Sequence, residues 1–103
     1  MARMNVEVCV GRTEQHTTIF VSVTDEGGKP IDDLAAADIG VHAIEGGLEV
    51  AVAGVAARGD GVYALPVTLA PLLASWPRGE HVLLVRVRRV FDRGQSLAVL
   101  TIP

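Results

Sequence analysis

Hydrophobic and polar residues alternate along most of this chain with a period of two, the pattern of β-strands that pack one face on a core. Every second residue from Met4 to Val10 is hydrophobic, whereas Asn5 and Glu7 fall on the other parity. The same alternation recurs further along and predicts seven strands in all. They cover residues 4–10, 17–24, 39–43, 48–56, 62–69, 81–91 and 96–102.

Glycine, proline and acidic residues separate these strands, because they favour turns and interrupt strand pairing. We expect turns or connections at residues 25–30, 45–47, 58–61, 70–80 and 92–95, and one short helical turn within 34–38. Pro66 lies inside a predicted strand. Because proline donates no backbone hydrogen bond, Pro66 predicts an edge position or a bulge there.

Seven short strands with no amphipathic helix favour an all-β fold. With a long connection before the last two strands, the arrangement expected is an immunoglobulin-like Greek-key β-sandwich of about seven antiparallel strands. A length of 103 residues is that of one domain, so residues 1–103 are expected to form a single sandwich.

Composition narrows the set of partners. The formal net charge is −3, whereas phosphate binding needs a concentrated positive surface, so we expect no nucleic acid partner. Arg86 and Arg88 share one face of a strand and form a local basic stripe, interpreted as a solvated face or an anion site.

No hydrophobic run approaches the roughly 20 residues that cross a bilayer, so we expect no membrane insertion. Cys9 is the one cysteine, and its place in an alternating strand predicts a thiol in or near the core.

Several local sequences point to a family. The stretch VSVTDEGGKPIDDL at 21–34, followed by DIGV at 38–41, resembles bacterial Ig-like modules. The sequences DGVY at 60–63 and PRGEHVL at 77–83 resemble later strands of the same modules. The resemblance covers roughly residues 19–91. It implies the sandwich fold, and it implies a setting in surface and repeat proteins, beside von Willebrand A domains, or in phage decoration proteins.

Three residues are predicted to have structural roles. Gly27 or the glycine after it permits a tight turn, and Pro30 directs the chain into a bend. Tyr63 is expected to pack its ring and to reach backbone with its hydroxyl, as a tyrosine corner does.

Candidate chemistry is sparse. Asp25, Asp32, Asp33 and Asp38 fall within one loop-rich stretch and are candidate Ca²⁺ ligands, with a solvated acidic rim as the other interpretation. The three histidines lie at no metal-ligand spacing, and no catalytic or phosphate-binding motif occurs. We therefore expect neither a cofactor nor enzymatic activity.

The amount of two-sided hydrophobicity is the most informative feature for function, because a lone sandwich is expected to present polar outer faces. Candidate interface residues are Ala51, Ala53, Val55, Trp76, Val82 and Leu84. Coverage by another subunit is the usual reason for such a surface. The sequence predicts a structural or protein-interaction module that assembles into a homo-oligomer or larger complex. The alternatives are an adhesion module whose loops bind Ca²⁺ or carbohydrate, and an accessory domain of a larger protein.

Overall fold

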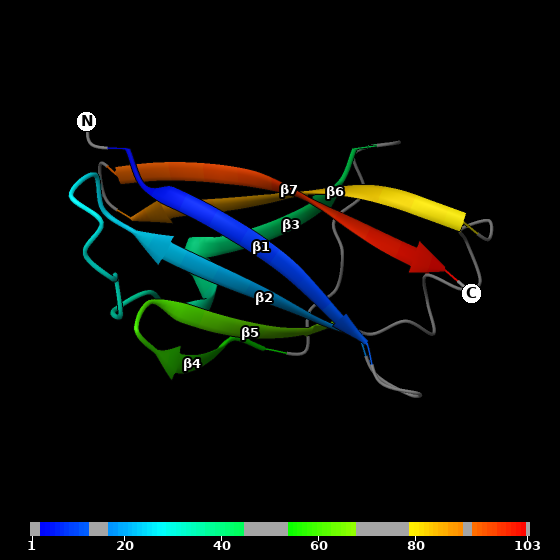
Figure 1. Cartoon of the computed structure of the whole chain (residues 1–103), viewed down its shortest axis with the longest axis horizontal. Coiled ribbons are helices and arrows are strands. Elements are labelled where there is room, and N and C mark those ends of the chain that lie inside the picture. Colours follow the sequence, from blue (N-terminus) through cyan, green and yellow to red (C-terminus); the bar gives the residue numbers. More distant parts are fainter. Residues whose placement is uncertain (1–2, 13–16, 45–53, 68–78, 90–91, 103) are drawn as a thin grey trace.

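Two antiparallel sheets make up the computed structural model, which describes residues 3–12, 17–44, 54–67, 79–89 and 92–102. One sheet has four strands, in the order β1 (Asn5–Arg12), β2 (Thr17–Thr24), β5 (Val62–Val67) and β4 (Ala56–Gly59). The other has three, in the order β3 (Ile39–Ala43), β6 (Gly79–Arg89) and β7 (Asp92–Ile102). The architecture is therefore all-β and consistent with a β-sandwich (Figure 1).

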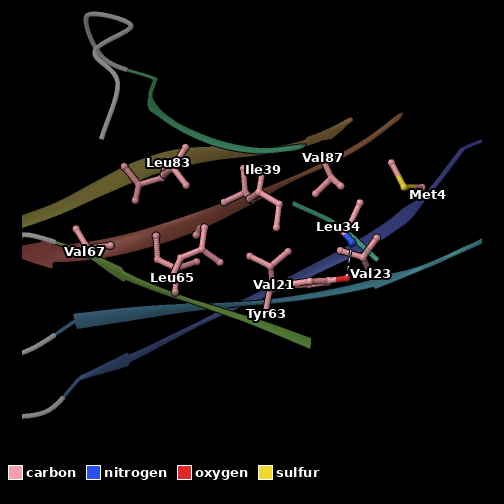
Figure 2. Packing of buried hydrophobic residues seen from close by; sticks show 14 of the residues in the cluster. Met4, Val21, Val23, Leu34, Ile39, Tyr63, Leu65, Val67, Leu83 and Val87 are labelled. Atoms are coloured by element: carbon pink, nitrogen blue, oxygen red, sulfur yellow. Dashed lines mark hydrogen bonds between the residues drawn. The ribbon is translucent and has the colours of Figure 1, made fainter. Parts of the chain in front are cut away.

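The core lies between the two sheets and is built from the predicted alternation. In β2, β3 and the middle of β6 every second residue is buried, and the residues between them are half-buried or exposed. Figure 2 shows side chains of both sheets meeting in this layer, among them Val21, Leu65 and Leu83. These three are fully buried. Val6, Val8 and Val10 of β1 are only partly buried against the same cluster, because β1 is the edge strand of its sheet.

The observed strands differ from the predicted ones mainly where turns were expected. β4 occupies Ala56–Gly59, so part of the predicted turn at 58–61 belongs to a strand. The remaining turn is Asp60-Gly61, and both residues have positive φ, 54° and 76°, as a type I′ hairpin turn requires. Most of the predicted strand at 48–56 and most of the predicted connection at 70–80 lie outside the described residues.

The hairpin of β6 and β7 is also tighter than predicted. Residues 92–95 were expected to form a turn, but they continue β7, and Asp92 pairs with Arg89. The cause is register: two long strands keep pairing wherever the backbone stays extended, even through the glycine at 94. The short helical turn does form, as a 3₁₀ turn over Ala36–Asp38.

Pro66 lies within β5, which is a central strand of its sheet. It pairs with Thr18 of β2 on one side. On the other side the described pairing to β4 reaches only Ala64, opposite Ala56. Pro66 is exposed and lies past the end of that ladder, so its missing N–H interrupts none of the described β4 bonds.

Tyr63 joins β5 to the long loop between β2 and β3. Its ring is buried, and its hydroxyl donates to the Ile31 carbonyl at 2.6 Å and accepts from the Leu34 N–H at 3.1 Å. Figure 2 shows Tyr63 and Leu34 joined in this way. The hydroxyl therefore reaches backbone as expected. A tyrosine corner closes on backbone a few residues upstream, whereas these bonds span 32 and 29 residues and tie two distant segments together.

The turn after β2 depends on Asp25. Its Oδ1 accepts hydrogen bonds from the N–H groups of Gly27, at 2.8 Å, and Lys29, at 2.9 Å. The residue with positive φ is Gly28, at 83°, so the conformational freedom predicted for Gly27 is used by its neighbour. Pro30 follows and forms an isolated antiparallel bridge with Thr24, which closes the bend.

Candidate functional site

The outer face of the β3-β6-β7 sheet carries the exposed large hydrophobic residues of the described part of the chain. The hairpin register sets Val82 beside Val99 and Leu84 beside Leu97, so two apolar pairs are adjacent on one face. Val82 is 40% exposed, Val99 49% and Leu97 57%, while Leu84 is half-buried. The predicted outward positions of Val82 and Leu84 therefore have two apolar neighbours that the sequence analysis did not single out.

Strand β3 extends this surface across the sheet. His42 lies beside Leu84 in the pairing register, and the Ile44 N–H donates to the Val82 carbonyl at 3.1 Å. Ile44 is 53% exposed. The outer face therefore holds two neighbouring rows across three strands. We call the five hydrophobic residues of these rows the apolar stripe, and polar His42 completes the second row. The apolar stripe consists of Ile44, Val82, Val99, Leu84 and Leu97.

Polar residues border the apolar stripe on both sides along the strand direction. On one side Glu80 pairs with Thr101, and on the other Arg86 pairs with Gln95. All four side chains are exposed. A hydrophobic centre with a polar rim is the usual anatomy of a protein interface.

The outer face of the other sheet is different. It carries Glu7, exposed, and the half-buried Thr18 and Ser22. Its large hydrophobic residue, Phe20, lies over Gly11, since a side-chain carbon placed on Gly11 would meet the Phe20 ring at 2.9 Å. Phe20 therefore covers its own sheet, and the contrast assigns the unpartnered hydrophobic surface to β3, β6 and β7.

An open cleft lies next to the basic end of the stripe, where β1 crosses β7. The Met4 N–H donates to the Arg93 carbonyl at 2.8 Å, and Gly94 permits the crossing because an added side-chain carbon would lie 2.6 Å from the Met4 carbonyl. The cleft has a volume of about 1070 Å³, and Arg3, Arg86, Arg88 and Arg93 line it. Figure 1 shows the start of β1 beside the start of β7. Arg86 and Arg88 therefore share one face, as predicted, and Arg3 and Arg93 from other segments lie beside them.

Arg89 differs from these arginines because it points to the other side of β6. It forms ion pairs with Asp33 and, at 3.3 Å, with Asp92. The hydrogen bond with Asp33 is the main cause that raises the pKa of Arg89 above its ordinary value, so the guanidinium stays charged. Among the described residues Arg89 forms the only ion pairs, which leaves the cleft arginines without an acidic partner in this part of the chain.

The four candidate calcium ligands have separate structural roles. Asp25 caps its own turn, and Asp33 pairs with Arg89. Asp32 Oδ1 accepts from the Gly61 N–H at 2.5 Å, and Asp38 Oδ2 accepts from the Ala35 N–H at 2.8 Å. Within the described ranges no group of three or more His, Cys, Asp or Glu side chains could hold a metal ion. The sequence brought these carboxylates into one stretch, but the loop does not gather them at one point.

Other predicted positions have mixed outcomes. Val55 was expected on an outer face, but it lies just before β4 and is partly buried against the core. Cys9 was expected in or near the core, but it is a free, exposed cysteine opposite Phe20 on the outer face of its sheet. Its parity, shared with Glu7, was the signal that should have placed it outside. Ala51, Ala53 and Trp76 lie outside the described residues.

Comparison with known protein families, with curated proteins and with solved structures finds no match to this chain. None of the helical residues described here forms a segment long and apolar enough to cross a membrane. The case for function therefore rests on the surfaces described above.

Proposed function

We propose that this chain is an immunoglobulin-like Greek-key sandwich that acts as a non-enzymatic structural or protein-interaction module. Immunoglobulin constant-type domains place strands A, B, E and D in one sheet and C, F and G in the other. Lettering β1 to β7 as A to G yields the same two groups, in the orders A-B-E-D and C-F-G. This agreement supports the proposed family of folds.

The observation that carries the functional proposal is the apolar stripe. Hydrophobic side chains at 40–57% exposure are adjacent on three paired strands. Covering this surface with another protein removes it from water and lowers the free energy. The polar residues at both ends supply a rim. The module therefore assembles, into a homo-oligomer or a larger complex, through the outer face of β3, β6 and β7.

The alternative of a Ca²⁺- or carbohydrate-binding adhesion module has less support. Its candidate ligands Asp25, Asp32, Asp33 and Asp38 are each used by a turn, a loop contact, an ion pair or a cap. An accessory domain of a larger protein is compatible with the same stripe, which would then contact that protein's other parts.

The proposal is tested by placing a charge in the stripe. Leu97→Lys puts an ammonium group at its most exposed position, and burying an unpaired charge in an interface costs several kcal/mol. Sedimentation velocity at micromolar concentrations should show an oligomer for the unmodified chain and a monomer for Leu97→Lys. Circular dichroism should be unchanged, because Leu97 is exposed and contributes little to the core.

Cys9→Lys is the matched control, because it adds the same side chain to the outer face of the other sheet. The control should remain associated. Reducing buffer is needed in all samples so that the exposed thiol forms no intermolecular disulfide. A monomer for the unmodified chain at about 100 μM, a concentration at which interfaces of standard size are filled, would contradict the proposal.

A further inference from the structure

The charged rims of the apolar stripe are arranged with an internal symmetry. Across the stripe and its rim, the outward residues of β6 are Glu80, Val82, Leu84 and Arg86, with Arg88 one row further out, so Glu80 and Arg86 lie at equal distances from the centre of the stripe. Their partners on β7 repeat the pattern, with polar Thr101 and Gln95 at the two ends. A surface of this kind is complementary to itself when it is reversed.

We propose that a second copy of this chain covers the stripe, face to face and with its strands reversed, so that Glu80 of each copy meets Arg86 of the other. This inference rests on the proposed function and specifies its partner. The two-fold axis lies across the strands, between the row of Leu84 and the row of Val82. Leu84 then faces Val82 of the second copy, and Leu97 faces Val99.

Charge selects this arrangement over the other symmetric one. When the strands of the two copies stay aligned, two identical sheet faces are related by a two-fold axis that runs either along or across the strands. With the axis along β6, the middle strand of the stripe, each row meets its own copy, and both Arg86 and Glu80 face like charges. Like-charge contacts in an interface cost several kcal/mol. With the axis across the strands, the same four side chains form two ion pairs of opposite sign.

The dimensions fit this geometry. Glu80 and Arg86 are six residues apart on β6, about 20 Å at the strand rise of about 3.4 Å per residue. Each ion pair therefore lies about 10 Å from the axis, outside the apolar rows. Stacked sheets are separated by about 10 Å, a distance that an arginine and a glutamate side chain can span together. A separation of about 20 Å also prevents Glu80 and Arg86 of one copy from pairing with each other.

Charge reversal tests the register. In either Arg86→Glu or Glu80→Arg alone, both symmetric sites hold like charges, and we expect the dimer dissociation constant to rise by at least about tenfold. The double variant E80R/R86E restores opposite charges at both sites, so its dissociation constant should return to within about threefold of the original. Arg88→Glu is the control on the same face of β6, because Arg88 lies past the last row that the second copy covers.

Mixing the two single variants is the sharpest measurement. A dimer of one Arg86→Glu chain and one Glu80→Arg chain has opposite charges at both sites, so an equimolar mixture should dimerise at concentrations where each variant alone is mostly monomeric. Sedimentation equilibrium or native mass spectrometry, in which the two chains differ in mass, reads this out directly. Impaired folding of a variant cannot produce such rescue, and circular dichroism verifies each fold.

The outcomes separate this inference from the function on which it rests. Rescue by mixing supports the reversed face-to-face dimer. A dimer that Leu97→Lys disrupts but that neither charge reversal weakens, or single variants that stay apart when mixed, overturns the register and leaves the proposed function standing. A chain that is monomeric in every form overturns both.

Discussion

Tyr63 is the residue whose structural role the molecule shows most fully. Its hydroxyl makes two hydrogen bonds, to the Ile31 carbonyl and from the Leu34 N–H, in a buried site at 1% exposure. Analogy with a tyrosine corner assigned Tyr63 a buried ring and a backbone partner from the sequence. It could not identify the partner, because the two segments lie about 30 residues apart and meet only in the fold.

Removing this hydroxyl tests its contribution to stability. Tyr63→Phe keeps the ring but leaves a buried N–H and a buried carbonyl without a partner, each of which costs about 1–3 kcal/mol. We expect the free energy of unfolding to fall by about 2–3 kcal/mol in urea titrations, with an unchanged dependence on denaturant. A loss below about 0.5 kcal/mol would show that water replaces the hydroxyl.

At the scale of elements, the hairpin of β4 and β5 is positioned against the end of β2 by Gly61. Its carbonyl accepts from the Val23 N–H at 2.8 Å, and its N–H donates to Asp32. A side-chain carbon on Gly61 would lie 2.4 Å from the Val23 carbonyl oxygen. The packing of the β4-β5 turn against β2 and the β2-β3 loop therefore requires a residue without a side chain at position 61.

Alanine substitution separates this close approach from backbone conformation. Gly61→Ala suffers both a positive φ and a backbone clash, whereas Gly28→Ala has a similar φ, 83°, in open space. Positive φ alone costs an alanine about 1–2 kcal/mol. We expect Gly28→Ala to lose about that amount and Gly61→Ala to lose at least about 3 kcal/mol, measured by urea unfolding. Equal losses for the two variants would mean that the hairpin shifts to relieve the contact.

At the scale of the whole molecule, carboxylates and arginines are distributed differently. The candidate calcium ligands lie between β2 and β3, and each contacts a different partner. The arginines gather at one open cleft, which is lined by Arg3, Arg86, Arg88 and Arg93. Clustering in the sequence therefore did not produce a site, and residues far apart in the sequence did produce a common surface.

Thermal unfolding distinguishes the adhesion alternative at this scale. A ligand that binds the folded chain raises its melting temperature in proportion to the logarithm of the ligand concentration. Because each of the four aspartates is held by its own contact and no two share a partner, we expect Ca²⁺ at millimolar concentrations and a chelator to give the same melting temperature. A rise with Ca²⁺ that Asp32→Asn and Asp38→Asn abolish would instead support a calcium site in this loop.

The sequence by itself determined the class of structure and the inward side of strands such as β2 and β3. The strands at residues 17–24 and 39–43 have the predicted bounds. The reason is local: a strand's side chains alternate between two faces, so a period of two in hydrophobicity decides which residues enter the core. Where both parities are hydrophobic, as at residues 82–85 and 97–100, the same rule leaves the outer face undecided.

Only the tertiary structure decided which residues make the candidate site. The apolar stripe exists because register sets Val82 beside Val99 and Leu84 beside Leu97 and His42, and no local pattern states which strands are neighbours. Strand order is determined by how the whole chain buries its core, which is a property of all contacts together. The sequence shows which residues are hydrophobic, whereas the pairing of β3, β6 and β7 brings them together on one surface.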